Sequence, residues 1–128
     1  MKRECRERLD EIAEKFKTCQ KSLSALGDET RQLIISTLLE NDYNGIRVGE
    51  IARHTHLSRP AVSHHLQVLK EAGIVNMRKE GTKNYYYIDS NESKWKTLHE
   101  LISLIYEGVQ ELNQADSQED AAADNWKL

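Results

Sequence analysis

The chain has 128 residues, of which 38% are hydrophobic, and its formal net charge is −3 at pH 7. This size and composition predict one small globular domain, and they exclude a transmembrane helix because no apolar run is long enough to cross a bilayer. The charged N-terminus has no apolar signal-peptide core, so we expect a cytoplasmic protein without a membrane partner.

A long N-terminal helix is predicted by apolar residues that recur every three or four positions. Judged from this period, the helix has roughly five to six turns. A single apolar stripe indicates that one face of the helix packs against another surface. The stripe consists of Leu9, Ile12, Ala13, Phe16, Cys19, Leu23 and Leu26.

Both cysteines fall on this predicted helix. Cys5 and Cys19 are fourteen residues apart, which is about 21 Å along a helix, so a disulfide within one chain is excluded. Cys19 belongs to the apolar stripe and is interpreted as a small buried hydrophobe. Cys5 is flanked by arginines, and nearby cations make a thiol more reactive. A redox response through Cys5 and Cys19 therefore stays as an alternative hypothesis.

Two short helices separated by a turn are predicted between residues 46 and 75. The residues His54–Leu57 are interpreted as the turn between them. Ser58 is expected to cap the second helix, Pro60 to occupy its first turn, and Gly73 to end it. The apolar stripes that face the core are Val48, Ile51 and Ala52 on the first helix, and Val62, Leu66 and Leu69 on the second.

The second helix of this pair has a polar outer face. Its side chains offer hydrogen-bond donors and acceptors with little net charge, as the reading of base edges in a major groove requires. We expect Ser58 and Arg59 to hold phosphates, whereas His65 lies near the apolar stripe and is interpreted as a packed residue. The outward positions are Arg59, Pro60, Ser63, His64 and Gln67, of which Ser63, His64 and Gln67 are expected to face the bases.

A β-hairpin is predicted directly after these helices. The segment from Val75 to Ile88 forms two short strands around Gly81 and Thr82, and its second half is rich in strand-forming tyrosines. The tip is basic because Arg78, Lys79 and Lys83 flank the turn. A helix-turn-helix followed by a basic hairpin is the order of a winged helix, in which the wing contacts backbone phosphates.

The negative net charge is unevenly distributed along the chain. Residues 47–88 contain seven Lys or Arg and three acids, which gives +4, whereas residues 107–128 contain six acids and one Lys, which gives −5. Contact with phosphates requires a local basic face, whatever the total charge. The charge pattern is therefore compatible with a DNA-binding protein.

A C-terminal helix with a heptad seam is also predicted. Its apolar surface exceeds what one small domain needs, so the first and last helices are expected to form a homodimer interface. The alternative is that both helices pack only on their own domain. The expected interface residues are Leu9, Ile12 and Phe16 in the first helix, and Trp95, Leu98, Ile102, Ile105 and Val109 in the last.

The domain boundary is placed where the composition changes. Residues 1–113 are expected to form the DNA-binding and dimerisation domain. Residues 114–128 are acidic and poor in packable side chains, and they are interpreted as a flexible tail. Trp126 is the exception in this segment, and docking on a partner subunit is one hypothesis for it.

Three segments of the chain carry a resemblance to a known family: Ala25–Arg31 (ALGDETR), Leu57–Val75 (LSRPAVSHHLQVLKEAGIV) and Arg78–Gly81 (RKEG). Through them the chain resembles the ArsR/SmtB family of bacterial and archaeal repressors, from about residue 21 to about residue 112. The resemblance implies a mainly α winged helix-turn-helix fold of order αααα-ββ-α. It also implies a homodimer that binds an inverted repeat in double-stranded operator DNA and releases it on a signal.

The usual metal sites of that family are not matched here. Arg47 and Gly49 stand where the family's C-V-C site has its two cysteines. On the last helix, neither register of the family's Asp/His pattern supplies two plausible ligands beyond its first acid, and zinc needs three or four. We expect no metal and no cofactor, and the effector is not identified by the sequence.

An enzyme is not predicted. The sequence has no glycine-rich phosphate loop, no G-x-S-x-G elbow and no set of catalytic residues with suitable spacing. A dimeric repressor is the main hypothesis, and a winged-helix module that binds only proteins is the alternative. The expected DNA-binding residues are Ser58, Arg59, Pro60, Ala61, Ser63, His64, Gln67, Arg78, Lys79 and Lys83.

Overall fold

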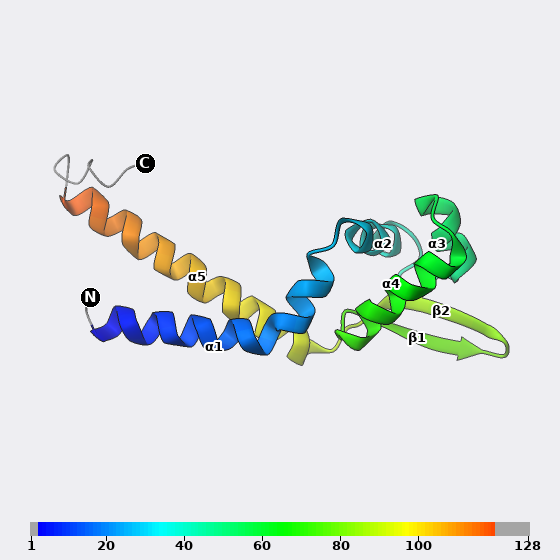
Figure 1. Cartoon of the computed structure of the whole chain (residues 1–128), viewed down its shortest axis with the longest axis horizontal. Helices are drawn as coiled ribbons and strands as arrows, with labels where there is room; N and C mark the ends of the chain where they lie inside the picture. The colour runs from blue at the N-terminus through cyan, green and yellow to red at the C-terminus, as the bar shows by residue number, and fades with distance from the viewer. Residues whose placement is uncertain (1–2, 120–128) are drawn as a thin grey trace. The chain divides into compact units, whose positions relative to one another are not determined.

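The computed structural model describes residues 3–119 and confirms a mainly α fold with one hairpin (Figure 1). Its element order is the predicted αααα-ββ-α order. Within the described range, no helix is long and apolar enough to cross a membrane. The elements are α1 (Arg3–Leu26), α2 (Glu29–Glu40), α3 (Val48–Thr55), α4 (Arg59–Glu71), β1 (Val75–Glu80), β2 (Lys83–Ile88) and α5 (Glu92–Glu119).

The chain divides into two compact units. One unit comprises residues 19–95 and contains α2, α3, α4 and the hairpin. The described part of the other unit comprises residues 3–18 of α1 and residues 96–119 of α5.

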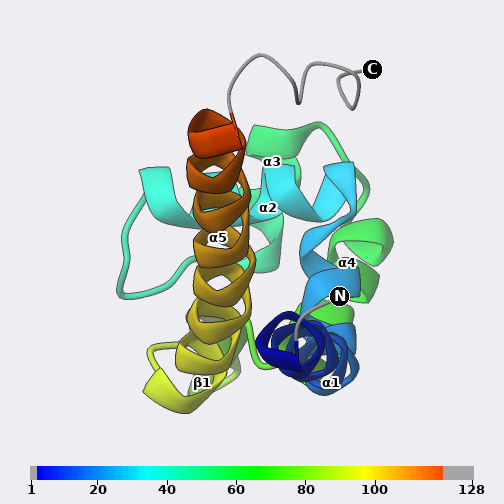
Figure 2. The same ribbon diagram turned by 90° about the vertical axis from the view of Figure 1, so that its left-hand side faces the viewer.

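The core of the unit formed by residues 19–95 lies where α2, α3 and α4 meet (Figure 2). The predicted inward stripe of α4 is confirmed, because Val62, Leu66 and Leu69 are fully buried. Ile51 of α3 and Ile34 of α2 complete this apolar centre. Each such side chain contributes about 1.5–3 kcal/mol when it leaves water, so this packing fixes which face of α4 remains outside.

The predicted ends of α4 are confirmed. The hydroxyl of Ser58 accepts a hydrogen bond from the N–H of Ala61 at 3.2 Å, as expected for an N-cap. At the other end, Gly73 has a φ of +79°. The N–H of Gly73 donates to the carbonyl of Lys70 at 3.0 Å, and the N–H of Ile74 donates to that of Leu69 at 2.9 Å. This pair of bonds is a Schellman motif.

The turn between α3 and α4 begins two residues later than predicted. Residues His54 and Thr55 belong to α3, and His56 makes the turn in the left-handed conformation with a φ of +60°. The hydroxyl of Thr55 donates to the carbonyl of Ile51 at 2.7 Å, so this buried polar side chain is satisfied inside the helix. Of the four residues predicted to form the turn, only His56 and Leu57 lie outside the helices.

The hairpin has the predicted strands and the predicted turn. Strands β1 and β2 are antiparallel, and Glu80 pairs with Lys83 across the two-residue turn. The first turn residue, Gly81, has a φ of +64°, a conformation that glycine adopts without steric cost. The hairpin therefore projects Lys79 and Lys83 close to its tip.

In the other unit, residues 3–18 of α1 and residues 96–119 of α5 run in opposite directions (Figure 1). Two ion pairs join them: Arg8 Nη1 lies 2.7 Å from Glu111 Oε1, and Lys15 Nζ lies 3.1 Å from Glu100 Oε2. The hydrogen bond from Lys15 lowers the pKa of Glu100. These pairs set the register of the two helices.

Helix α5 extends beyond the expected domain boundary. Residues 114–119, which were expected to belong to the tail, are helical. Trp126 and the rest of the expected tail from residue 120 onward lie outside the described residues.

Candidate nucleic-acid interface

The outer face of α4 carries the side chains expected to read bases. Ser63, His64 and Gln67 are all exposed, whereas the opposite face of the helix is buried. The amide of Gln67 donates to Glu71 Oε1 at 3.0 Å, which holds the side chain along the helix. The carbonyl oxygen and the second N–H of this amide remain available to a base edge.

The first turn of α4 presents a small polar surface. Ser58, Arg59 and Pro60 are exposed, and Ala61 is half-buried. The Ser58 oxygen already accepts the capping bond, so its hydroxyl hydrogen is the group left to donate to a phosphate. Ser58 and Arg59 are the residues predicted to hold phosphates, and that role stays a prediction.

The three basic residues of the hairpin differ in their surroundings. Lys79 and Lys83 are exposed and have no ion-pair partner within the described part of the chain. Arg78 Nε lies 3.0 Å from Glu80 Oε1, and its guanidinium lies 4.9 Å from the centre of the Tyr85 ring. The charge of Arg78 is therefore partly compensated, and the two lysines are the stronger candidates for phosphate contact.

A contact that the sequence pattern did not predict joins the hairpin to the loop before α3. Ile46 and Tyr86 exchange two backbone hydrogen bonds of 2.9 Å each. The preceding residue, Gly45, has a φ of +127°, and a Cβ on it would lie 3.0 Å from the Cβ of Tyr85. The bridge between Ile46 and Tyr86 therefore holds Arg47, which follows Ile46 in the chain, beside the hairpin.

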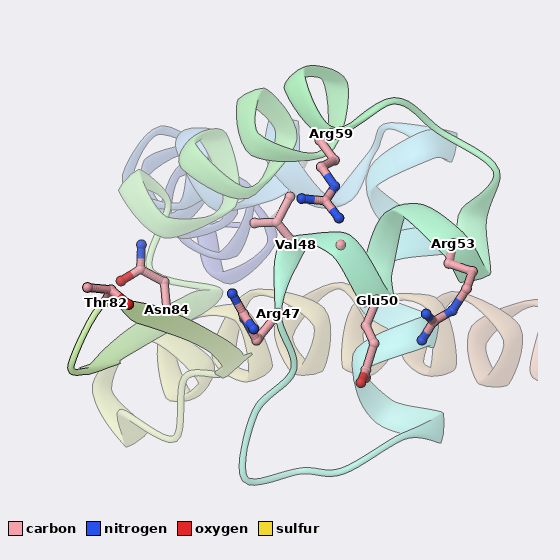
Figure 3. A pocket seen from close by; sticks show the side chains of 8 residues that line it. Arg47, Val48, Glu50, Arg53, Arg59, Thr82 and Asn84 are labelled. Carbon is pink, nitrogen blue, oxygen red and sulfur yellow. The ribbon is translucent and has the colours of Figure 1, made fainter.

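A cavity of about 410 Å³ lies between the start of α3, the start of α4 and the hairpin (Figure 3). Three of its eight lining residues are arginines and one is an acid. Arg59 is the one residue among them that the sequence predicts to bind DNA. The lining residues are Arg47, Val48, Gly49, Glu50, Arg53, Arg59, Thr82 and Asn84.

Asp28 and Arg31, which belong to one of the segments that carry the family resemblance, bind the ends of helices: Asp28 the start of α2, and Arg31 the end of α1. The carboxylate of Asp28 caps α2 by accepting the N–H of Arg31 at 2.9 Å. This hydrogen bond, together with the nearby guanidinium charge, lowers the pKa of Asp28. The guanidinium of Arg31 donates to the carbonyl of Ala25 at 2.9 Å and lies 3.2 Å from Nδ1 of His65.

The residues expected at the dimer interface are unequally covered in the single chain. Leu9, Phe16, Ile102 and Val109 are 46%, 47%, 58% and 47% exposed. Ile12 and Ile105 are half-buried, and Leu98 is buried. The indole N–H of Trp95 donates to the carbonyl of Asp89 at 2.6 Å, within residues 19–95.

The cysteines and histidines form no metal cluster in the part of the chain that the structure describes. No three His, Cys, Asp or Glu side chains converge there. Cys5 is exposed, and Cys19 is only 2% exposed, which confirms its interpretation as a buried hydrophobe.

The chain is similar to known transcription regulators. The sequence model of the family described as "Bacterial regulatory protein, arsR family" matches residues 28–77. An uncharacterized HTH-type transcriptional regulator, MJ1325 of Methanocaldococcus jannaschii, is 40% identical over 94 residues, which cover 73% of this chain and 98% of that protein. The transcriptional repressor SdpR of Bacillus subtilis is 35% identical over 66 residues, which cover 52% of this chain and 70% of that protein.

A solved structure shares the fold. It is the solution NMR structure of the homodimeric winged helix-turn-helix DNA-binding domain of Mb0332 from Mycobacterium bovis, described as a possible ArsR-family transcriptional regulator. The identity is 25% and the TM-score is 0.52, and the match covers 87% of this chain and 92% of that one.

Proposed function

The chain belongs to the arsR family of bacterial regulatory proteins, and we propose that it is a homodimeric repressor that binds an inverted repeat in operator DNA. The observation that carries this proposal is the exposed polar face of α4 beside a basic hairpin. Both belong to the segment of residues 47–88, whose charge is +4. A module that binds only proteins would not need this combination. The proposed repressor acts on DNA in the cytoplasm.

In this proposal, α4 enters the major groove. Ser63, His64 and Gln67 contact base edges, because they are the exposed polar side chains of the helix. Ser58 and Arg59 contact phosphates at the start of the helix, and Lys79 and Lys83 contact phosphates from the hairpin. Arg78 contributes less than the lysines, since Glu80 already compensates part of its charge.

The proposed dimer uses the apolar residues that the single chain leaves exposed. Leu9, Phe16, Ile102 and Val109 lie on α1 and α5, and exposed apolar surface of this kind favours association. The homodimeric state of the Mycobacterium bovis domain supports the same assembly. A two-fold dimer presents two copies of α4 and thus binds half-sites related by inversion.

The experiment that tests this function is selection of binding sites from a pool of random duplexes. We expect an inverted repeat whose half-site centres are about 10 base pairs apart. Failure to enrich any sequence, with a purified and folded dimer, would contradict sequence-specific binding. Transcription in vitro from a promoter containing the selected site should then fall when the protein is added, and a rise would contradict the repressor assignment.

A further inference from the structure

We propose that the cavity between α3, α4 and the hairpin is an oxyanion site that holds a phosphate group, with the DNA backbone as its source. This inference rests on the proposed DNA-binding function and adds a site to it. The site is separate from the expected base-reading face, because none of Ser63, His64 and Gln67 lines the cavity. Its principal residues are Arg47, Gly49 and Arg59, which all line the cavity.

The first reason is uncompensated positive charge. Among the residues whose side chains the structure describes, no carboxylate forms an ion pair with Arg47, Arg53 or Arg59. Glu50 also lines the cavity, but its carboxylate points away from Arg59 (Figure 3). Guanidinium groups present several N–H donors in a plane that matches the oxygens of a phosphate.

The second reason is the start of α3. Arg47 occupies its N-cap position, and no side chain accepts a hydrogen bond from the first turn. The N-terminus of a helix carries a partial positive charge, so an arginine there opposes the helix dipole. A phosphate would satisfy the free N–H groups and offset both positive charges. A bound anion would therefore explain why Arg47 occupies a position where its positive charge by itself is unfavourable.

The third reason is the contact between α3 and Arg59. A Cβ on Gly49 would lie 2.8 Å from Nη2 and 3.2 Å from Cζ of Arg59. The absence of a side chain at residue 49 thus lets the guanidinium reach from α4 to the start of α3 (Figure 3). Any larger residue at this position would force the guanidinium of Arg59 to shift.

The fourth reason is the position of the cavity between the two elements proposed to contact DNA. Thr82 and Asn84 of the hairpin line one side, and Arg59 of α4 lines another. The bridge between Ile46 and Tyr86 fixes the loop that carries Arg47 against β2. A DNA strand that passes from the groove to the wing would bring a phosphate to this point.

Two variants test the site. Arg47→Gln removes one charge but retains hydrogen-bonding capacity. Gly49→Ala leaves every charge in place and puts a Cβ 2.8 Å from Nη2 of Arg59, so that the guanidinium must shift. Alanine also favours a helix more than glycine does, so Gly49→Ala is expected to fold. The control is Lys70→Gln, which removes one charge from an exposed residue that does not line the cavity.

The measurement is the slope of log Kd against log salt concentration on the selected duplex and on a random duplex. Loss of one phosphate contact lowers the slope by about 1 per protomer, and affinity falls alike on both duplexes. We expect this result for Arg47→Gln and Gly49→Ala but not for Lys70→Gln. Slopes of Arg47→Gln and Gly49→Ala equal to that of Lys70→Gln would overturn the DNA phosphate as occupant.

Two further arms identify the source of the phosphate. In the first arm, each duplex has a single phosphate replaced by a neutral methylphosphonate. At one position of the replacement, Arg47→Gln should no longer lower the affinity, and that position locates the contacted DNA phosphate. Inorganic phosphate is titrated into the free protein against chloride at equal ionic strength, with the amide signals of Val48 and Gly49 recorded by NMR. Saturable shifts of these amide signals, with no effect of the two variants on DNA binding, would assign the site to a free anion and overturn DNA as the source of the phosphate.

The outcomes also separate this site from the proposed function. Absence of DNA binding by the wild-type protein would defeat the function itself, and the phosphate titration would then decide the cavity alone. If neither the DNA slopes nor the amide signals respond, the oxyanion site is wrong even when the protein binds its operator.

Discussion

The guanidinium of Arg31 lies 3.2 Å from Nδ1 of His65 and links the start of α2 to α4. Arginine can only donate hydrogen bonds, so Nδ1 of His65 is the acceptor in this contact. The adjacent His64 is exposed. Two neighbouring histidines of one helix therefore have different surroundings: one is held by Arg31, and the other is available to DNA.

Replacing Arg31 should destabilise the fold. In Arg31→Ala, the carbonyl of Ala25 and the ring of His65 lose a charged donor, and hydrogen bonds to charged groups contribute about 1.5–3 kcal/mol each. We expect a loss of unfolding free energy on the order of 2 kcal/mol in urea denaturation. The control Lys70→Gln should unfold like the wild type. Equal midpoints for Arg31→Ala and the control would show that the contact does not hold α4.

The cap at Asp28 should make stability depend on pH. The hydrogen bond from the N–H of Arg31 lowers the pKa of Asp28 in the folded protein. The ionised Asp28 cap therefore contributes its full stabilisation of the fold at pH values above the unfolded pKa of about 3.9. This stabilisation is lost as the pH falls through the lower, folded pKa. Asp28→Asn keeps an acceptor oxygen but cannot titrate.

The comparison between wild type and Asp28→Asn isolates this effect. We expect the wild type to be the more stable at neutral pH, and the difference to shrink as the pH falls below about 3.9. Denaturation curves recorded between neutral pH and pH 2 measure it. A difference that is the same at every pH would contradict the assigned role of the carboxylate.

The parts of the fold that depend on neighbouring residues could be predicted from the sequence. Ser58 and Gly73 mark the ends of α4 because a cap and a left-handed glycine act within one helical turn. Gly81 marks the hairpin turn for a similar reason. The buried stripe of α4 follows from the helical period, and with it the exposed positions of His64 and Gln67.

The contacts between distant residues could not be predicted in this way. Ile46 and Tyr86 are forty residues apart, and Arg31 and His65 are thirty-four apart. Neither pair leaves a local pattern, since a bridge and an arginine contact depend on how whole elements pack. The cavity around Arg47 was missed for this reason, although the basic excess of residues 47–88 pointed to that part of the chain.

The dimer can be tested at Ile102. Its side chain is 58% exposed in the single chain, so Ile102→Glu should leave the fold of the protomer intact. In a dimer the new carboxylate would be buried without a partner, which costs several kcal/mol. We expect a shift to monomer in sedimentation experiments and loss of operator binding. The control Gln110→Glu adds the same charge at another exposed position of α5.

That prediction would fail if Ile102→Glu sedimented as the wild type does. Such a result would place the dimer interface on another surface. It would not contradict the proposed reading of bases by Ser63, His64 and Gln67 of α4.

Binding should depend strongly on salt. Arg59, Lys79 and Lys83 are exposed, and a dimer presents each of them twice. About six phosphate contacts would lower the affinity by roughly 10³ between 50 and 200 mM salt. Fluorescence anisotropy with a labelled duplex measures this dependence. A nearly flat dependence would mean that few phosphates are contacted.

The most direct test of the central claim compares His64→Ala, Gln67→Ala and Lys83→Ala on the selected operator and on random DNA. If α4 reads bases, the first two substitutions should each cost about 1–3 kcal/mol on the operator and little on random DNA. Lys83→Ala should weaken both duplexes alike, because a phosphate contact carries no sequence information. Equal losses on both duplexes for all three variants would contradict the claim that this face of α4 reads the operator.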